Sequence, residues 1–297
     1  MKILVIGNCQ SYPLALALTA MHSNIHIESI AVNQCNDSDE ESNIKKIENA
    51  DFIITQEISQ NFRVSHLQTW NVKEIFGGRN LIKIPNLFFK GYHPDLCYIS
   101  RDSKRVLSPL GDYNHSIIFN SWQRGYTVDE CKSFISNHKP MPENFHEFIV
   151  KAEDSIEELV TREFSLDIKI TDYIKENWKT KRLFHTFNHP TPPLIVALAR
   201  RILNKLDIRN FKKLEPYLLD DKLNSVIASG FDVFKEYYAT PVALLPNYTK
   251  TKAIETSEFT LKVTRNVEFL SLSELVEKSY ILYDLQVGKP SGEFRFS

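Results

Sequence analysis

The sequence lacks any long apolar run, and its longest apolar stretches fall far short of the roughly 20 residues that cross a bilayer. It also lacks a charge excess, because a formal net charge of -1 gives no field to attract nucleic acid or anionic lipid. The first six residues lack the cleavage site and the longer apolar stretch of a signal peptide. These absences predict a cytoplasmic protein with no membrane span and no nucleic-acid partner.

Cysteine is scarce, and no two cysteines are close enough for a CxxC pair, which excludes zinc knuckles and thioredoxin motifs. In a reducing compartment all four are expected to be free thiols. His185 and His189 lie on a stretch with strand character, where a four-residue separation exceeds about 12 Å, so no metal site is expected. The four cysteines are Cys9, Cys35, Cys97 and Cys131.

Phosphate-binding glycine patterns are also absent, since there is neither a GxGxxG fingerprint nor a P-loop. Basic residues do cluster, and most of them are typical of solvated surfaces. One cluster near the edge of a sheet could hold the phosphates of a cofactor. The clusters contain Lys90, Arg101, Lys104 and Arg105, then Lys179, Lys181 and Arg182, then Arg200 and Arg201.

What the sequence does contain is a regular alternation of strand-like and helix-like stretches over its first 85 residues. This alternation predicts an α/β fold with a mostly parallel central sheet covered by helices on both faces. We expect a core at 1–208 with a helical insertion at about 125–180, and a C-terminal extension at 209–297 packed on that core. Strands are predicted at 2–6, 25–32, 51–55, 80–84, 116–119 and 182–187, and helices at 12–22, 44–49, 64–76, 127–137, 194–206 and 272–285.

Polar residues follow several of these strands. In open parallel sheets, ligands bind at the carboxyl ends of the strands. We therefore expect the polar groups to meet at one edge of the sheet. They are residues 7–11, Gln56, His93, Asn188 and His189.

Cys9 stands in the turn between the first strand and the first helix. The unpaired N–H groups and the dipole of a helix N-terminus stabilise a thiolate, so we expect a lowered pKa and a nucleophile. Gly7 permits the tight turn, and the neighbouring N–H groups could form an oxyanion hole. The alternative is a small apolar residue packed beneath the turn.

A cysteine nucleophile usually needs a base, and His189 is the first candidate. It follows a predicted strand and precedes prolines, which hold a loop histidine in one orientation. His93, in the stretch GYHPD, is the second candidate, as a base or a substrate contact. Gln56 could hydrogen-bond an oxyanion or a sugar hydroxyl beside Cys9.

Four short stretches, ILVIGNCQ, IITQEI, GYHPD and TFNHPT, together resemble the WcbI-type polysaccharide biosynthesis proteins. The resemblance covers roughly residues 1–205. It implies a three-layer α/β sandwich, a variant of the SGNH (GDSL) hydrolase fold with extra helices, and acetyl transfer in bacterial capsule synthesis. Carried over, Cys9 is the nucleophile and His189 its base. Thr186 stands where SGNH enzymes usually carry an aspartate, so a dyad or another orienting group is needed.

The resemblance also implies coenzyme A or acetyl-CoA as a substrate, without a metal. We assign the oxyanion and substrate contacts to Gln10, Gln56, His93 and Asn188. Contacts to coenzyme A are assigned to Gly7, Asn8 and Tyr92. The expected reaction moves an acetyl group to a sugar hydroxyl of a polysaccharide precursor. An esterase or thioesterase of the same fold, or a non-catalytic module that binds coenzyme A or a nucleotide sugar, remains the alternative.

Overall fold

The computed structural model describes residues 1–78, 80–256, 261–288 and 294–297, and the chain divides into two compact units. The division differs from the expected core and C-terminal extension, because much of the middle of the chain joins the C-terminal third. Unit 1 contains residues 1–88, 156–178 and 189–223, and unit 2 contains residues 89–155, 179–188 and 224–297.

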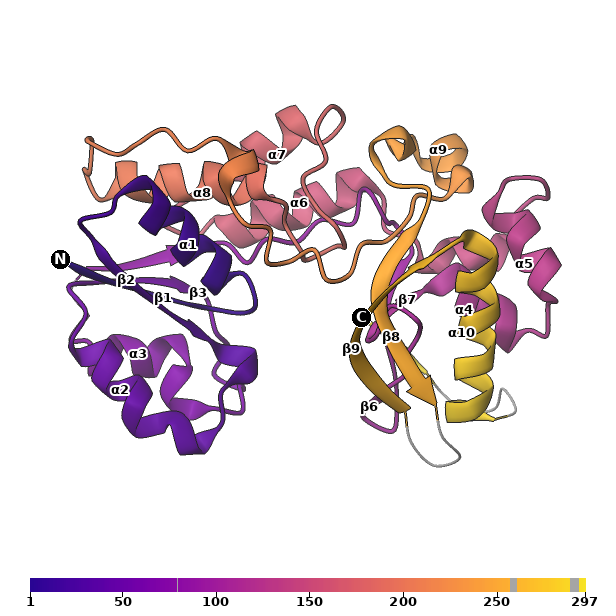
Figure 1. Ribbon diagram of the computed structural model, residues 1–297, viewed down its shortest axis with the longest axis horizontal. Helices are drawn as coiled ribbons and strands as arrows, with labels where there is room; N and C mark the ends of the chain where they lie inside the picture. Colours follow the sequence, from indigo (N-terminus) through magenta and orange to yellow (C-terminus); the bar gives the residue numbers. More distant parts are fainter. Residues whose placement is uncertain (79, 257–260, 289–293) are drawn as a thin grey trace. The chain divides into compact units, whose positions relative to one another are not determined.

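Unit 1 is built on a four-stranded sheet in the order β2-β1-β3-β4, in which every neighbouring pair is parallel (Figure 1). The predicted α/β class and parallel sheet are thus confirmed. The register pairs Ile6 with Ile30 and Thr55, and Gln56 with Ile84, so the strands end at the same edge. The strands are β1 (Lys2–Gly7), β2 (His26–Ala31), β3 (Phe52–Gln56) and β4 (Leu81–Ile84).

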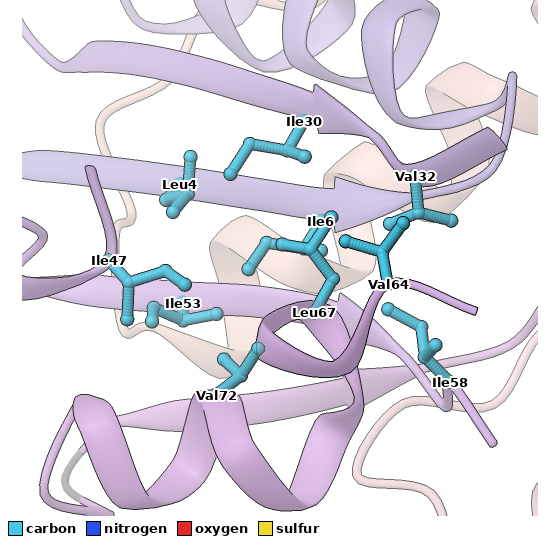
Figure 2. Close-up of a cluster of buried hydrophobic side chains, with 10 residues drawn as sticks. All are labelled: Leu4, Ile6, Ile30, Val32, Ile47, Ile53, Ile58, Val64, Leu67 and Val72. Atoms are coloured by element: carbon cyan, nitrogen blue, oxygen red, sulfur yellow. The ribbon is translucent and has the colours of Figure 1, made fainter. Parts of the chain in front are cut away.

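Helices cover both faces of this sheet, as Figure 1 shows: α1 (Ser11–Met21) and α8 (Pro192–Lys205) lie on one side, and α2 (Glu40–Glu48) and α3 (Thr69–Ile75) on the other. Branched side chains of three strands pack against α2 and α3, because strands buried on both faces need apolar residues throughout. Burying such a side chain stabilises the fold by roughly 1.5–3 kcal/mol. The cluster contains Leu4, Ile6, Ile30, Val32, Ile47, Ile53, Ile58, Val64, Leu67 and Val72 (Figure 2).

Two further helices are α6 (Ala152–Glu163) and α7 (Thr171–Asn177). The buried carboxylate of Glu163 accepts the N–H groups of Ile170 and Thr171, at 2.7 and 3.2 Å, where α7 begins. These N–H groups have no partner within the helix, so the carboxylate supplies one.

Unit 2 is organised around the antiparallel strand β5, which pairs with β6, β7 and β10. A second, two-stranded sheet pairs β8 with β9. The predicted helices at 127–137 and 272–285 are present, each with the reciprocal side-chain cap that its Ser/Thr-x-x-Glu sequence predicts. The elements are β5 (Leu96–Arg101), β6 (Lys104–Arg105), β7 (Tyr113–His115), α4 (Ser116–Gln123), α5 (Val128–Ile135), α9 (Asp232–Tyr238), β8 (Thr249–Thr256), β9 (Leu261–Leu270), α10 (Leu272–Val287) and β10 (Arg295–Phe296).

Two predicted strands are wrong. Residues 116–119 open helix α4, whose apolar residues are buried on every side and so show no helical period. Residues 182–187 form no strand element, and the hydroxyl of Tyr92 accepts the N–H of Leu183 instead of a ladder partner.

Short 3-10 turns complete the chain, and no described helix has the length and apolarity to cross a membrane. The turns are η1 (Val32–Gln34), η2 (Asp37–Asp39), η3 (Ser65–Leu67), η4 (Glu143–Phe148), η5 (Pro216–Leu218) and η6 (Val242–Leu244).

Candidate functional site

The turn after β1 is closed by hydrogen bonds in which oxygens of Asn8 are the acceptors. Its carbonyl accepts the N–H of Ser11 at 3.0 Å, and its side-chain oxygen accepts the N–H of Gln10 at 3.0 Å. Its own N–H donates to Oε1 of Gln56 at 2.8 Å, and its side-chain amide donates to Asn86 at 2.9 Å. Asparagine favours such turns because its side chain bonds the backbone two residues on.

Gln10 joins this turn to the chain that follows β4. Its side-chain amide donates to the carbonyl of Leu87 at 2.7 Å, and its Oε1 accepts the N–H of Leu87 at 3.0 Å. Gln56 adds a third bond, from Nε2 to Oε1 of Gln10, at 2.9 Å. Both glutamines are buried. Their amides, which we expected at an oxyanion or a substrate, hold three strand ends together.

Gly7 lies beneath the side chain of Gln56, which leaves no room for a Cβ atom. Packing therefore gives a reason for glycine here that does not involve coenzyme A. The role that we expected for Gly7 in permitting the tight turn stays a prediction, and the observed requirement is the close approach of Gln56, since glycine lets another group lie against the backbone.

The thiol of Cys9 is partly exposed at this turn. Burial raises the pKa of Cys9 to about 11, against the smaller opposing effect of a hydrogen bond to its own backbone. This direction is opposite to the lowered pKa predicted from the helix N-terminus. The N–H groups of Gln10 and Ser11 are bonded within the turn, and that of Asn8 is bonded to Gln56, so each of these expected oxyanion donors already has a partner.

A small cavity lies beside the turn, with room of about 10 Å³, enough for about one water molecule. Ser11, at the start of α1, and Ile195 and Leu198 of α8 are among its lining residues. The buried hydroxyl of Ser11 has no hydrogen-bond partner in the part of the chain that the structure describes. A single water is the occupant that fits this space.

His189 belongs to unit 1 with Cys9 and lies three residues before α8. Its side chain is partly exposed. Because α8 packs against α1, the histidine and the cysteine sit near the N-terminal ends of two helices on the same face of the sheet. The pairing of His189 with Cys9 stays a prediction.

The other predicted site residues lie in unit 2. The hydroxyl of Tyr92 donates to the carbonyl of Lys181 and accepts the N–H of Leu183, and the ring is buried. The side chain of Asn188 accepts the hydroxyl of Tyr113 at 2.7 Å and donates to that of Tyr98 at 3.0 Å. Both polar groups are thus engaged within the unit.

His93 is 2% exposed. Burial holds its pKa well below the usual value, with a further lowering from nearby His115 and Arg182, so the ring is neutral at physiological pH. A hydrogen bond to the backbone of His185 acts in the opposite direction. The environment of His93 is therefore a polar cluster inside unit 2.

Sequence reasoning missed Asp95 and His115, which form a buried pair with Oδ1 and Nδ1 at 2.9 Å. The register of β5 and β7 places Leu96 opposite His115, so Asp95 comes next to it. Asp95 belongs to the stretch GYHPD, but no sequence pattern marks His115, 20 residues later. The pairing becomes visible only with the strand register.

The basic residues near β6 line a hollow of about 480 Å³ in unit 2. Arg101 donates to the carbonyl of Val287 at 3.2 Å, at the end of α10, and Arg105 lies 4.4 Å from the ring centre of Tyr98. No group of three or more metal-ligating side chains is found among the described residues.

A parallel α/β unit with a partly exposed thiol in the turn after its first strand defines the class of protein: an open-sheet α/β protein, with its candidate site at the carboxyl edge. The family described as "Polysaccharide biosynthesis enzyme WcbI" matches residues 2–210, so the chain belongs to the WcbI family.

Among solved structures, the chain is similar to one of WcbI, described as "a novel polysaccharide biosynthesis enzyme", in a native form "without disulfide bond" between coenzyme A and a cysteine. The TM-score is 0.66 at 20% sequence identity, with 98% of this chain and 90% of that chain covered. At this identity the likeness shows the fold. No curated protein matches the chain.

Proposed function

We propose that this protein is an acetyltransferase that moves an acetyl group from acetyl-CoA to a sugar hydroxyl of a polysaccharide precursor, with Cys9 as the nucleophile. Membership of a polysaccharide biosynthesis family supports the acceptor class. The observation that carries the proposal is the position of a partly exposed thiol at the carboxyl edge of a parallel sheet, at the start of α1. The proposal places the protein in the cytoplasm, where thiols stay reduced.

Acetyl-CoA is taken as the donor because the similar structure is described in terms of a disulfide between coenzyme A and a cysteine. We take Cys9 as the corresponding thiol. It is more exposed than Cys97 or Cys131, which are buried and whose pKa values burial raises to about 12. A thiol that forms a disulfide with coenzyme A lies beside the sulfur that carries the acetyl group.

In the first step, His189 takes the thiol proton while Sγ of Cys9 attacks the carbonyl carbon of acetyl-CoA. The carbon–sulfur bond to coenzyme A breaks, and the departing sulfur takes the proton from His189. In the second step, the sugar hydroxyl attacks the acetyl-cysteine and gives its proton to His189. That proton passes to Sγ of Cys9 as the acetyl–sulfur bond breaks. A base is needed because a thiol of pKa about 11 is almost fully protonated at pH 7.

A second function, binding of coenzyme A without covalent catalysis, is favoured by one specific observation. The raised pKa of Cys9 and the bonded N–H groups of its turn are the reverse of an activated nucleophile with an oxyanion hole. On this alternative, Cys9 contacts the ligand and forms no acetyl intermediate.

Acid-quenched mass spectrometry after mixing with acetyl-CoA separates the two functions. The transferase proposal expects a 42 Da adduct on Cys9 in the wild type, and none on Cys9→Ser. Cys35→Ser, which removes another partly exposed thiol, serves as the matched control and keeps the adduct. Coenzyme A that binds in calorimetry without any adduct supports the binding function. Absence of both binding and adduct contradicts the proposal.

His189→Asn tests the base. We expect adduct formation to slow by roughly a hundredfold or more, since general bases contribute about 10²–10⁴ in rate. Coenzyme A affinity should stay within about threefold. An unchanged rate of adduct formation would assign the base elsewhere.

A further inference from the structure

Unit 1 contains a hollow of about 560 Å³ that acyl transfer at Cys9 does not use. It lies between the first residues of β1 and β2 and the helix α2. Strand β1 runs from Lys2, at the hollow, to Gly7, beside the turn of Cys9, so the two places are about 17 Å apart along the strand. Ligand sites in proteins measure about 300–1,000 Å³, so this space suits a small organic molecule.

The strand register brings polar side chains of β1 and β2 to the α2 face of the sheet. Lys2 pairs with His26, and Leu4 pairs with Glu28, so the members of each pair share a face. Leu4 packs in the same apolar cluster as Ile47 of α2, as Figure 2 shows, and Lys2 lies two residues before it on the strand. The polar ends of both strands therefore face α2 across the hollow.

Positive charges outnumber negative charges around the hollow, where three lysines and two glutamates are among the lining residues. Both glutamates already have a partner. Oε1 of Glu41 accepts from Nζ of Lys45 at 2.6 Å, and Oε1 of Glu28 lies 2.8 Å from Nε2 of His26. The excess of positive charge holds whether His26 is protonated or neutral.

Lys2 and Lys46 supply this excess. Among the described residues, no ion pair joins either ammonium group to a carboxylate. A hydrogen bond with His26 holds the pKa of Glu28 below its usual value, and the charges of Lys46 and Lys2 add to this lowering. Lys46 is in the last turn of α2, where a lysine offsets the helix dipole, but Lys2 is on a strand and has no such role. Two unpaired cations thus reach the hollow from different elements.

The lining defines the chemistry of the ligand. A phosphate monoester carries a charge of about −1.5 to −2 at pH 7 and three acceptor oxygens, which match two ammonium groups. Nine of the twelve lining residues are polar, and they include carboxylates, hydroxyls and an amide, which all form hydrogen bonds with hydroxyl groups. A larger polyanion would have its further charges close to the two glutamates, which disfavour it. A sugar with a single phosphate satisfies both sets of groups.

We propose that this hollow is a second binding site, which takes a phosphorylated sugar. Lys2 and Lys46 hold the phosphate, because their ammonium groups are the unpaired charges of the lining. The sugar hydroxyls donate to the remaining lone pairs of Glu28 and Glu41, and Asn49 adds an amide that both donates and accepts. The site does not depend on the chemistry at the other end of β1.

The test is titration calorimetry of the full-length protein with D-glucose 1-phosphate, D-mannose 1-phosphate, inorganic phosphate and D-glucose as separate probes. At least one sugar phosphate should bind about tenfold more tightly than inorganic phosphate or D-glucose, because each of these two makes only half of the contacts. Equal affinities for the sugar phosphates and inorganic phosphate would overturn the proposal, and so would the absence of sugar-phosphate binding.

Charge-removing variants test the two lysines. Lys2→Gln and Lys46→Gln should each weaken sugar-phosphate binding by roughly threefold to tenfold, since each removes one ion pair with the phosphate at a solvent-accessible site. Lys73→Gln is the matched control, because Lys73 is also in the last turn of a helix, α3, but does not line the hollow. Its affinity should equal that of the wild type. A loss with Lys73→Gln as large as that with Lys46→Gln would mean attraction by overall charge alone and would overturn the proposal.

Backbone amide NMR of the wild type locates the ligand without any variant. A bound sugar phosphate should shift the resonances of Glu28, Lys46 and Ala50, which line the hollow, and leave those of residues 8–10 unchanged. The opposite pattern would overturn the proposal.

Coenzyme A also carries phosphate groups, so it is added as a competitor. If coenzyme A displaces the sugar phosphate from the hollow, the hollow belongs to the acetyl donor and the proposal is overturned. A missing acetyl adduct on Cys9, with sugar-phosphate binding intact, would count against the proposed acetyl transfer and not against this site.

Discussion

The side chain of Gln56 lies so close to Gly7 that a Cβ atom at position 7 would be 2.7 Å from its Oε1 and 2.9 Å from its Cδ. Gln56 has little freedom to move, because it bonds the N–H of Asn8 and the side chain of Gln10. Position 7 therefore couples the end of β1 to the end of β3.

Gly7→Ala should destabilise the protein by ~1–3 kcal/mol, the range for inserting one atom into a packed site. Chemical denaturation measures the loss. In the Gln56→Ala background the same substitution should cost much less, since the clashing side chain is gone. Equal losses in both backgrounds would mean that the contact between Gly7 and Gln56 is not the cause.

Gln10→Ala should cost ~2–4 kcal/mol of unfolding free energy, because it leaves both backbone groups of buried Leu87 without partners. Urea unfolding gives the value. Asn49→Ala removes an exposed side-chain amide bonded to Lys45 and serves as the control, with a change within about 0.5 kcal/mol. If the two variants lose the same unfolding free energy, the hydrogen bonds of Gln10 do not stabilise the fold.

The alkylation rate of Cys9 by iodoacetamide should rise about tenfold per pH unit from pH 7 to 10. The thiolate is the nucleophile, and its fraction grows this way at every pH well below a pKa of about 11. Peptide mass spectrometry resolves the site. Cys97 and Cys131 are buried and should label only on unfolding. An alkylation rate that levels off near pH 7 would instead indicate a lowered pKa of Cys9, as the sequence predicts.

Stability should fall as pH drops below about 6.5. The folded pKa of His93 is lowered well below 6.5, so on acidification the unfolded chain takes up a proton that the folded chain does not. The stabilisation is present above 6.5 and is lost at up to about 1.4 kcal/mol per pH unit below it. Thermal melts across pH 4.5–7.5 measure the slope.

His93→Gln should reduce the slope of stability against pH by up to about 1.4 kcal/mol per pH unit, which is the contribution of one proton. The variant keeps the neighbouring residues His115, His185 and Arg182 in place. An identical slope in the wild type and the variant would place the titrating group elsewhere.

The sheet of unit 1 could be predicted because its strands show short apolar runs, as in Ile3–Ile6, or an alternation of apolar and polar residues, as in β2. Helix α4 could not, since Ile117, Ile118 and Phe119 are buried together and imitate a buried strand. Its first N–H groups are bonded by Asp95, whose position depends on the fold.

The candidate site was predicted less well than the sheet. Candidate residues could be selected because they follow predicted strands, but the role of each residue depends on partners that are distant in the sequence. Gln10 meets Leu87, 77 residues away, and Asp95 meets His115 across a strand pair. No local pattern reports such pairs. The division into two units was missed for the same reason, since unit 2 combines three separate stretches of chain.

Three of the four residues in Gly7-Asn8-Cys9-Gln10 have a structural role. Gly7 leaves room for the side chain of Gln56, and the side-chain amides of Asn8 and Gln10 form hydrogen bonds. Cys9 is the exception, because within the described residues its thiol bonds to its own backbone and secures no other element. We expect Cys9→Ser to leave the hydrogen bonds of this turn in place, because none of them uses the thiol. The surrounding residues hold the backbone of Cys9 in a fixed position, so on the proposed function a substitution of Cys9 is expected to remove activity while leaving the turn folded.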